Sequence, residues 1–159
     1  PADGASAQSE SLVPRPGLMP KANFYPLQES TSAARQQFAC RLTEKACSLG
    51  NRVHINTESA QQAKHMDELL WQYKPTAFLP HCLFEAGQDP AEKITIAYGS
   101  IEVKSGDVLI NLADTIYEFH NRFSHINEII LNDGESLTQG RKDYRFFQNA
   151  GYETTSYPQ

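Results

Sequence analysis

The chain has 159 residues, of which 40% are hydrophobic and 21% are charged, and its formal net charge is -5. That length suits one domain with a core of its own, and the composition is typical of a folded globular protein. A pI near 5.5 excludes the broad basic face that most nucleic-acid-binding domains carry, but it leaves room for a small basic patch.

The first eighteen residues differ in composition from the rest. They are rich in Pro, Ala, Ser and Gly, show no period, and include Leu12-Val13-Pro14-Arg15, which resembles a protease-cleavage tag. We expect residues 1–18 to be a tag remnant or a flexible leader, with a natural disordered extension as the alternative. Residues 19–159 are expected to form a single domain.

The next part of the chain shows the pattern of two strands alternating with two helices. Its helical segments carry apolar side chains at spacings of three and four, and its strand-like segments are short, apolar and bounded by turn residues. In chain order we expect a strand at 23–27, a helix at 32–49, a strand at 52–56 and a helix that starts at 57–59 and ends near Tyr73.

The rest of the chain continues this alternation. Residues 107–112 are nearly continuous in apolar side chains, which is typical of a buried central strand. Asp114 is the expected N-cap of a short helix that holds Ile116, Phe119 and Phe123. In chain order we expect an apolar stretch at 78–84, strands at 94–98 and 107–112, that short helix, a strand at 127–131, a helix from 133–136 to about 149 with Gly151 after it, and a last strand at 152–157.

Strands that alternate with helices define an α/β fold. We expect a mostly parallel, twisted sheet with helices on both faces. The order is Rossmann-like, yet the chain contains neither GxGxxG nor GxxxxGK[ST], so we expect no phosphate-binding loop.

No catalytic or metal-binding motif stands out. The sequence lacks GxSxG and HExxH, and its five histidines show no ligand spacing. Asp67 and Glu68 are adjacent, so on a helix they do not face each other. We expect no catalytic residue, no metal and no cofactor, and we interpret His81 as a hydrogen-bonded loop residue.

Three cysteines occur without a CxxC: Cys40, Cys47 and Cys82. Cys40 and Cys47 share one face of a helix, so a metal or redox pair is one interpretation. We favour small buried side chains in a reducing compartment. Because the chain has no run of about 18 apolar residues and no secretory signal, we expect it in the cytoplasm.

Trp71 is the chain's only tryptophan, and with Phe78 it spans a helix end and the loop that follows. If both rings are buried, they pin that loop to the sheet, and the pattern alone favours this interpretation. If they are exposed, they form an aromatic hot spot for a partner.

The segment from Gly140 to Tyr152 combines cations and aromatic rings in an otherwise acidic chain. Arg141, Tyr144 and Arg145 lie three and four positions apart, so they can meet on one helix face. Two guanidinium groups beside a ring suit a carboxylate on an apolar side chain, such as the C-terminal residue of a peptide. A solvated helix face is the alternative, and Phe146 and Phe147 are expected to pack the helix.

The order of several motifs resembles the chi subunit of bacterial DNA polymerase III over residues 19–157. The residues that carry the resemblance are Phe24-Tyr25, Gly50-Asn51-Arg52-Val53, Met66-Asp67-Glu68-Leu69-Leu70-Trp71, Phe78-Leu79-Pro80-His81, Asp107-Val108-Leu109-Ile110-Asn111-Leu112, and Gly140-Arg141 through Ala150-Gly151-Tyr152.

The resemblance implies a non-catalytic subunit of a DNA-directed DNA polymerase assembly. It implies that the chain joins the psi subunit, and through it the clamp loader, by way of Trp71 and Phe78. It also implies that Arg141, Tyr144, Arg145 and Ile130 bind the acidic C-terminal tail of single-stranded DNA-binding protein. The family often has a lysine near the start of this helix, where the chain has Ser136-Leu137-Thr138-Gln139. Whether a helicase also uses the psi-facing surface stays open.

Two other functional classes remain as alternatives. One is an enzyme of nucleotide metabolism on a degenerate α/β scaffold, and it would need a phosphate loop or an acid–base pair. The other is a direct DNA-binding module, and it would need a broad basic face with interleaved aromatic rings. The sequence offers none of these features, so we expect contact with nucleic acid only through a partner.

Overall fold

The computed structural model describes residues 19–74, 78–85, 91–101 and 106–159, so the expected leader lies outside the described residues. The described strands form one seven-stranded sheet in the order β3-β4-β2-β5-β6-β1-β7, and every neighbouring pair is parallel. This confirms the predicted α/β fold. The strands are β1 (Lys21–Pro26), β2 (Val53–Thr57), β3 (His81–Leu83), β4 (Ile94–Tyr98), β5 (Val108–Asn111), β6 (His125–Ile130) and β7 (Glu153–Ser156).

Each α-helix begins at a polar N-cap side chain. Thr31, Ser59 and Asp133 each accept a hydrogen bond from the backbone N–H three residues further on, which satisfies one of the free donors of a first turn. The helices are α1 (Ser32–Ser48), α2 (Ala60–Gln72) and α3 (Gly134–Asn149), with a 3₁₀ helix η2 (Glu118–Arg122).

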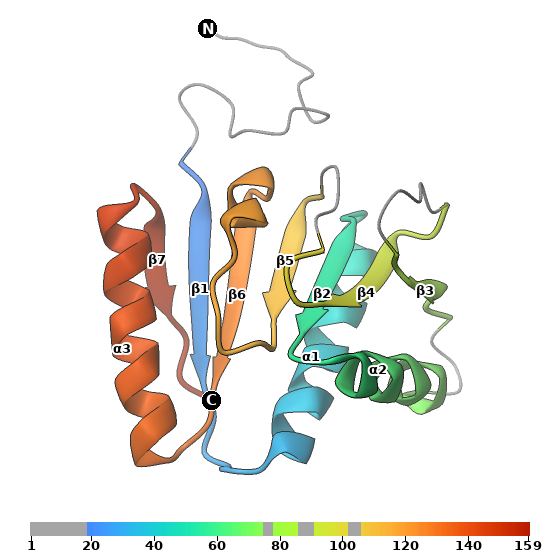
Figure 1. The fold of residues 1–159 in the computed structure, drawn as a ribbon, viewed down its shortest axis with the longest axis horizontal. Coiled ribbons are helices and arrows are strands. Elements are labelled where there is room, and N and C mark those ends of the chain that lie inside the picture. Colours follow the sequence, from blue (N-terminus) through green and yellow to red (C-terminus); the bar gives the residue numbers. More distant parts are fainter. Residues whose placement is uncertain (1–18, 75–77, 86–90, 102–105) are drawn as a thin grey trace, which may run out of the picture.

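The helices cover both faces of the sheet, as expected. On one face α1 and α2 bury an apolar cluster that includes Phe38, Met66 and Ile110. On the other face α3 and η2 bury a second cluster that includes Phe123 and Phe147. Figure 1 shows α3 beside β7 and β1, and α2 near β2, β4 and β3 at the other end of the sheet. The continuous apolar strand β5 lies at the centre of the sheet with all four residues buried.

The prediction that Asp114 caps a short helix is wrong. The 3₁₀ helix begins four residues later, with Tyr117 at its N-cap position, and Phe123 lies beyond its last residue. The reason is a long-range contact: the backbone N–H of Asp114 donates a hydrogen bond of 2.8 Å to the Glu58 carboxylate. The chain after β5 is thereby held against the end of β2 and does not enter a helix at once.

Other differences are small. Within the apolar stretch 78–84, only His81–Leu83 forms strand β3. The strand begins after Pro80, because proline has no backbone N–H to donate to a neighbouring strand. The predicted strand 94–98 matches β4 at both ends. Gly151 has a φ of 91°, which is the left-handed conformation expected of a residue just after a helix.

Candidate functional site: two exposed surfaces

Helix α3 lies on the sheet through small and aromatic residues. Gly140 is buried, and a Cβ atom at this position would lie 3.0 Å from Cδ1 of Ile130. The absence of a side chain therefore lets the helix approach the end of β6 closely. Phe147 is fully buried. Phe146 is 46% exposed, but its ring lies 5.3 Å from the ring of Phe147, so the expectation that both phenylalanines pack the helix holds fully for Phe147 and in part for Phe146.

Tyr144 links α3 to the edge of the sheet. Its ring lies 5.1 Å from the ring of Phe24 in β1. Its hydroxyl donates a hydrogen bond of 3.2 Å to the carbonyl of Thr154 in β7. The side chain is half-buried, so the ring is held in place while part of it faces solvent.

Arg141 and Arg145 lie one turn apart on the exposed side of α3, and Tyr144 lies three positions after Arg141. Both side chains are exposed, and among the residues that the structure describes neither forms an ion pair or a side-chain hydrogen bond. Guanidinium groups left free beside a partly exposed ring can accept a carboxylate in bidentate fashion. We call Arg141, Tyr144 and Arg145 the basic flank of α3.

Ile130 is the fourth residue expected at this site. It is the last residue of β6, where it pairs with Pro26 of β1, and it is half-buried. Its side chain lies under Gly140, one position before Arg141, and packs with Tyr144 against the same apolar cluster. Ile130 and the basic flank are thus brought to one region of the molecule by the contact at Gly140. A glycine inside a predicted helix was the sequence signal for this approach.

The other flank of α3 has the opposite character. Asp143 accepts a hydrogen bond of 2.9 Å from the Gln139 amide. Burial, more than any other cause, raises the pKa of Asp143. Beneath it Glu128 of β6 is buried and accepts a hydrogen bond of 3.0 Å from Asn111 of β5. Sequence reasoning missed this buried pair, because the two residues are 17 positions apart and come together only when β5 and β6 pair.

A second surface lies at the opposite edge of the sheet. Trp71 in the last turn of α2 is 57% exposed and Phe78 is 80% exposed. The interpretation of both rings as core residues is therefore wrong, and the rings are exposed instead. Leu83, on the edge strand β3, is 42% exposed and adds to the apolar character of this edge. The sequence held a signal for this: Trp71 follows the buried Leu70 by one position, which turns it about 100° away from the core.

His81 holds this second surface in shape. Its ring is buried and lies 4.2 Å from the indole of Trp71. One ring nitrogen lies 2.6 Å from the carbonyl of Leu79, and the other lies 2.9 Å from the carbonyl of Asp67. The predicted hydrogen-bonded role of His81 is confirmed, although the residue begins β3. The histidine ties β3 and its preceding loop to α2.

The cysteines and histidines do not gather into a metal-binding group anywhere in the described part of the chain. Cys40, Cys47 and Cys82 are free thiols, and Cys40 is buried. Burial raises the pKa of Cys40 to about 12 and is the largest cause that raises the pKa of Cys82 to about 11. At neutral pH these thiols stay protonated and are poor nucleophiles.

These features define a class of protein. It is an α/β protein with a parallel sheet, and it presents an apolar surface at one edge of the sheet and a basic flank at the other. Within the described residues, no helix has the length and apolar character needed to cross a membrane.

Comparison with known proteins narrows the class to one family. The family model of the DNA polymerase III chi subunit matches residues 19–155. The chain is 33% identical over 136 residues to DNA polymerase III subunit chi of Haemophilus influenzae, covering 85% of this chain and 94% of that protein. It is 31% identical over 134 residues to DNA polymerase III subunit chi of Pseudomonas aeruginosa, covering 84% of this chain and 93% of that protein. It is 27% identical over 139 residues to DNA polymerase III subunit chi of Escherichia coli, covering 84% of this chain and 95% of that protein.

The chain therefore belongs to the DNA polymerase III chi subunit family, as its motifs suggested. It is an accessory subunit of the replication polymerase.

Proposed function

We propose that this subunit links the clamp loader to single-stranded DNA-binding protein by holding two partners at two separate surfaces. The basic flank of α3 binds the acidic C-terminal tail of single-stranded DNA-binding protein. The apolar edge that carries Trp71 and Phe78 binds the psi subunit. In this role the chain supplies no catalytic residue to the polymerase assembly, and it works in the cytoplasm, where the chromosome is copied.

One observation carries the proposal for the tail: two arginines with no ion pair among the described residues lie one turn apart on α3, and Arg141 is three positions before a fixed, partly exposed tyrosine on an acidic protein. The acidic residues of the tail are attracted to the arginines, and the terminal carboxylate pairs with Arg141. The apolar side chain of the last tail residue packs against Tyr144 and Ile130. The chain's own negative charge repels acidic segments elsewhere on its surface.

The second surface is supported by its composition. Tryptophan is among the residues that most often dominate binding energy at interfaces, and an exposed indole costs solvation free energy until a partner covers it. Trp71 and Phe78 are the two side chains that the family resemblance assigns to psi. The edge strand β3 beside them has an outer backbone side that no described strand pairs with.

A pull-down tests the tail proposal directly. Single-stranded DNA-binding protein immobilised on beads should retain this chain, and the same protein lacking its last residues should not. Equal retention by both forms would show that the tail is not the ligand. Retention by neither form, with a folded chain, would show that single-stranded DNA-binding protein is not a partner of this chain alone.

A further inference from the structure

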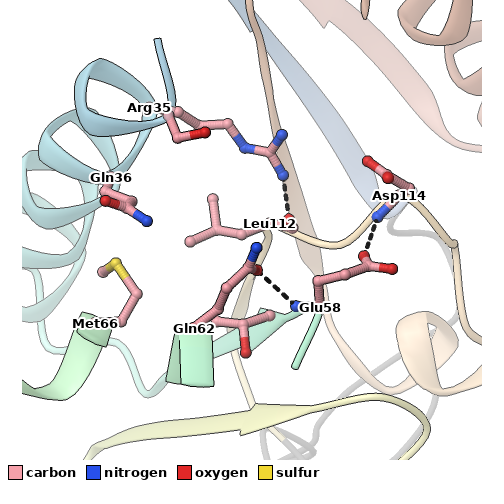
Figure 2. A pocket seen from close by; sticks show the side chains of 9 residues that line it. Arg35, Gln36, Glu58, Gln62, Met66, Leu112 and Asp114 are labelled. Carbon is pink, nitrogen blue, oxygen red and sulfur yellow. Dashed lines mark hydrogen bonds between the residues drawn. The ribbon is translucent and has the colours of Figure 1, made fainter. Parts of the chain in front are cut away.

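A polar cavity of about 210 Å³ opens at the carboxyl edge of the sheet, between α1, α2 and the ends of β2 and β5 (Figure 2). β2 and β5 are neighbours in the sheet, yet the chain leaves them in opposite directions, towards β3 after β2 and towards β6 after β5. In open parallel sheets, ligands bind where the strand order reverses in this way. None of the residues that line the cavity belongs to the basic flank of α3 or to the apolar edge at Trp71, although Arg35 and Asp114 also line a smaller pocket that reaches Ile130.

Internal hydrogen bonds hold the charged side chains around this cavity. The Arg35 guanidinium donates to the carbonyl of Leu112. The Glu58 carboxylate accepts from the backbone N–H of Asp114 at 2.8 Å, and the N–H of Glu58 donates to the Gln62 amide oxygen at 3.0 Å. Figure 2 shows Arg35 on one side of the opening, with Glu58 and Asp114 across from it. The site is thus pre-formed.

The charged groups leave much of their binding capacity unused. Arg35 has five N–H donors, and Leu112 takes one of them. Within the described ranges, Arg35 forms no ion pair with either carboxylate, and neither Glu58 nor Asp114 meets a cation. The cavity therefore offers one cationic and two anionic groups that face the same space without neutralising each other.

We propose that this cavity binds a small zwitterion of the α-amino-acid class, with its carboxylate on Arg35 and its ammonium group on Glu58 and Asp114. A volume of about 210 Å³ is below the range of roughly 300–1,000 Å³ typical of pockets for larger ligands. None of the described residues that line the cavity is aromatic, which disfavours a nucleobase because such a ligand would lack a stacking partner.

The charge of the lining predicts an order of preference. Among the described lining residues, one arginine and two carboxylates sum to -1, so an amino acid with a net positive charge matches the cavity best. Lysine should bind more tightly than alanine, and glutamate should bind least. The two ammonium groups of lysine can share the two carboxylates, whereas the side-chain carboxylate of glutamate would meet like charge.

Titration of the ¹⁵N-labelled full chain with L-lysine, L-alanine or L-glutamate tests the proposal. Lysine should produce saturable amide shifts at Glu58, Gln62 and Asp114, with weaker saturation by alanine and none by glutamate. Glu58→Gln should weaken lysine binding at least tenfold, since it removes a charge but keeps an oxygen that can accept from Asp114. Glu68→Gln, an exposed change on α2 outside the cavity, is the matched control and should leave the affinity unchanged.

Two results would overturn the proposal. One is the absence of saturable shifts with all three amino acids. The other is an equal lysine affinity in Glu58→Gln and in the parent chain, which would mean that lysine binds elsewhere. Thermal unfolding of Glu58→Gln shows whether the variant is folded. Arg35→Lys is a second variant, which keeps the positive charge but loses the planar guanidinium group. It should bind alanine more weakly than the parent chain does. The pull-down with single-stranded DNA-binding protein does not depend on these outcomes.

Discussion

Glu128 is a carboxyl group in the interior, between β6 and α3. Burial, as the largest cause, raises its pKa to about 8, and nearby Asp143 adds to the rise. The hydrogen bond from Asn111 and the charge of Arg35 act in the opposite direction. At neutral pH the buried group is therefore mostly the neutral acid, which avoids the cost of an unpaired charge in the core.

This protonation predicts a pH-dependent stability. Because the folded pKa lies above the unfolded one, the stability contributed by Glu128 is full below about pH 4.5 and falls as pH rises to about 8. Glu128→Gln, which cannot ionise, should resemble the parent chain near pH 5 and exceed its free energy of unfolding at pH 8.5 by on the order of a few kcal/mol. Urea unfolding at both pH values measures this. Glu68→Gln, an exposed change, is the control and should show no such pH-dependent gain. If Glu128→Gln differed from the parent chain in free energy of unfolding by the same amount at both pH values, the raised pKa of Glu128 would be contradicted.

At the scale of elements, the end of α2 and the edge strand β3 form one unit that exposes its aromatic rings. His81 connects the two by its hydrogen bonds to Leu79 and Asp67, and its ring supports the indole of Trp71. The fold does not need these exposed rings to fill its core. The apolar edge can therefore be changed without loss of the sheet.

Trp71→Ala should separate binding from folding. We expect this variant to lose its complex with the psi subunit, since a central tryptophan of an interface commonly costs about 2 kcal/mol or more when truncated. Its free energy of unfolding should change by less than about 1 kcal/mol, because the side chain is 57% exposed. Co-purification with psi and urea unfolding measure the two effects. Glu68→Ala on the same helix is a control, and a Trp71→Ala variant that also loses binding to the acidic tail would contradict the separation.

The sequence predicted best those elements whose signals are local. The strand at 94–98 and the start of α3 at Asp133 follow from neighbouring residues alone. The segment after β5 could not be predicted in this way, since the partner of Asp114 is Glu58, 56 positions earlier in the chain. The burial of Glu128 likewise depends on α3 covering it, and the cavity near Arg35 depends on four elements that meet only in the fold.

At the scale of the whole molecule, the sheet order separates the two proposed partners. The basic flank belongs to the helix that packs on β7 and β1 at one end of the sheet, and the apolar edge belongs to β3 and α2 at the other (Figure 1). Changes at sites this far apart, with no shared contacts, are expected to act independently. The proposed linking role requires that both partners be held at once, and this separation of the two surfaces is consistent with it.

The central claim is that the basic flank of α3 binds the acidic tail, and titration calorimetry with an acidic peptide ending in Pro-Phe tests it most directly. Arg141→Ala should abolish measurable binding, because truncating one partner of a charge-assisted contact costs on the order of 2 kcal/mol or more, roughly a thirtyfold loss of affinity. Lys64→Ala, an equal loss of charge at an exposed position on α2, should bind like the parent chain. An unchanged affinity of Arg141→Ala for this peptide would contradict the account.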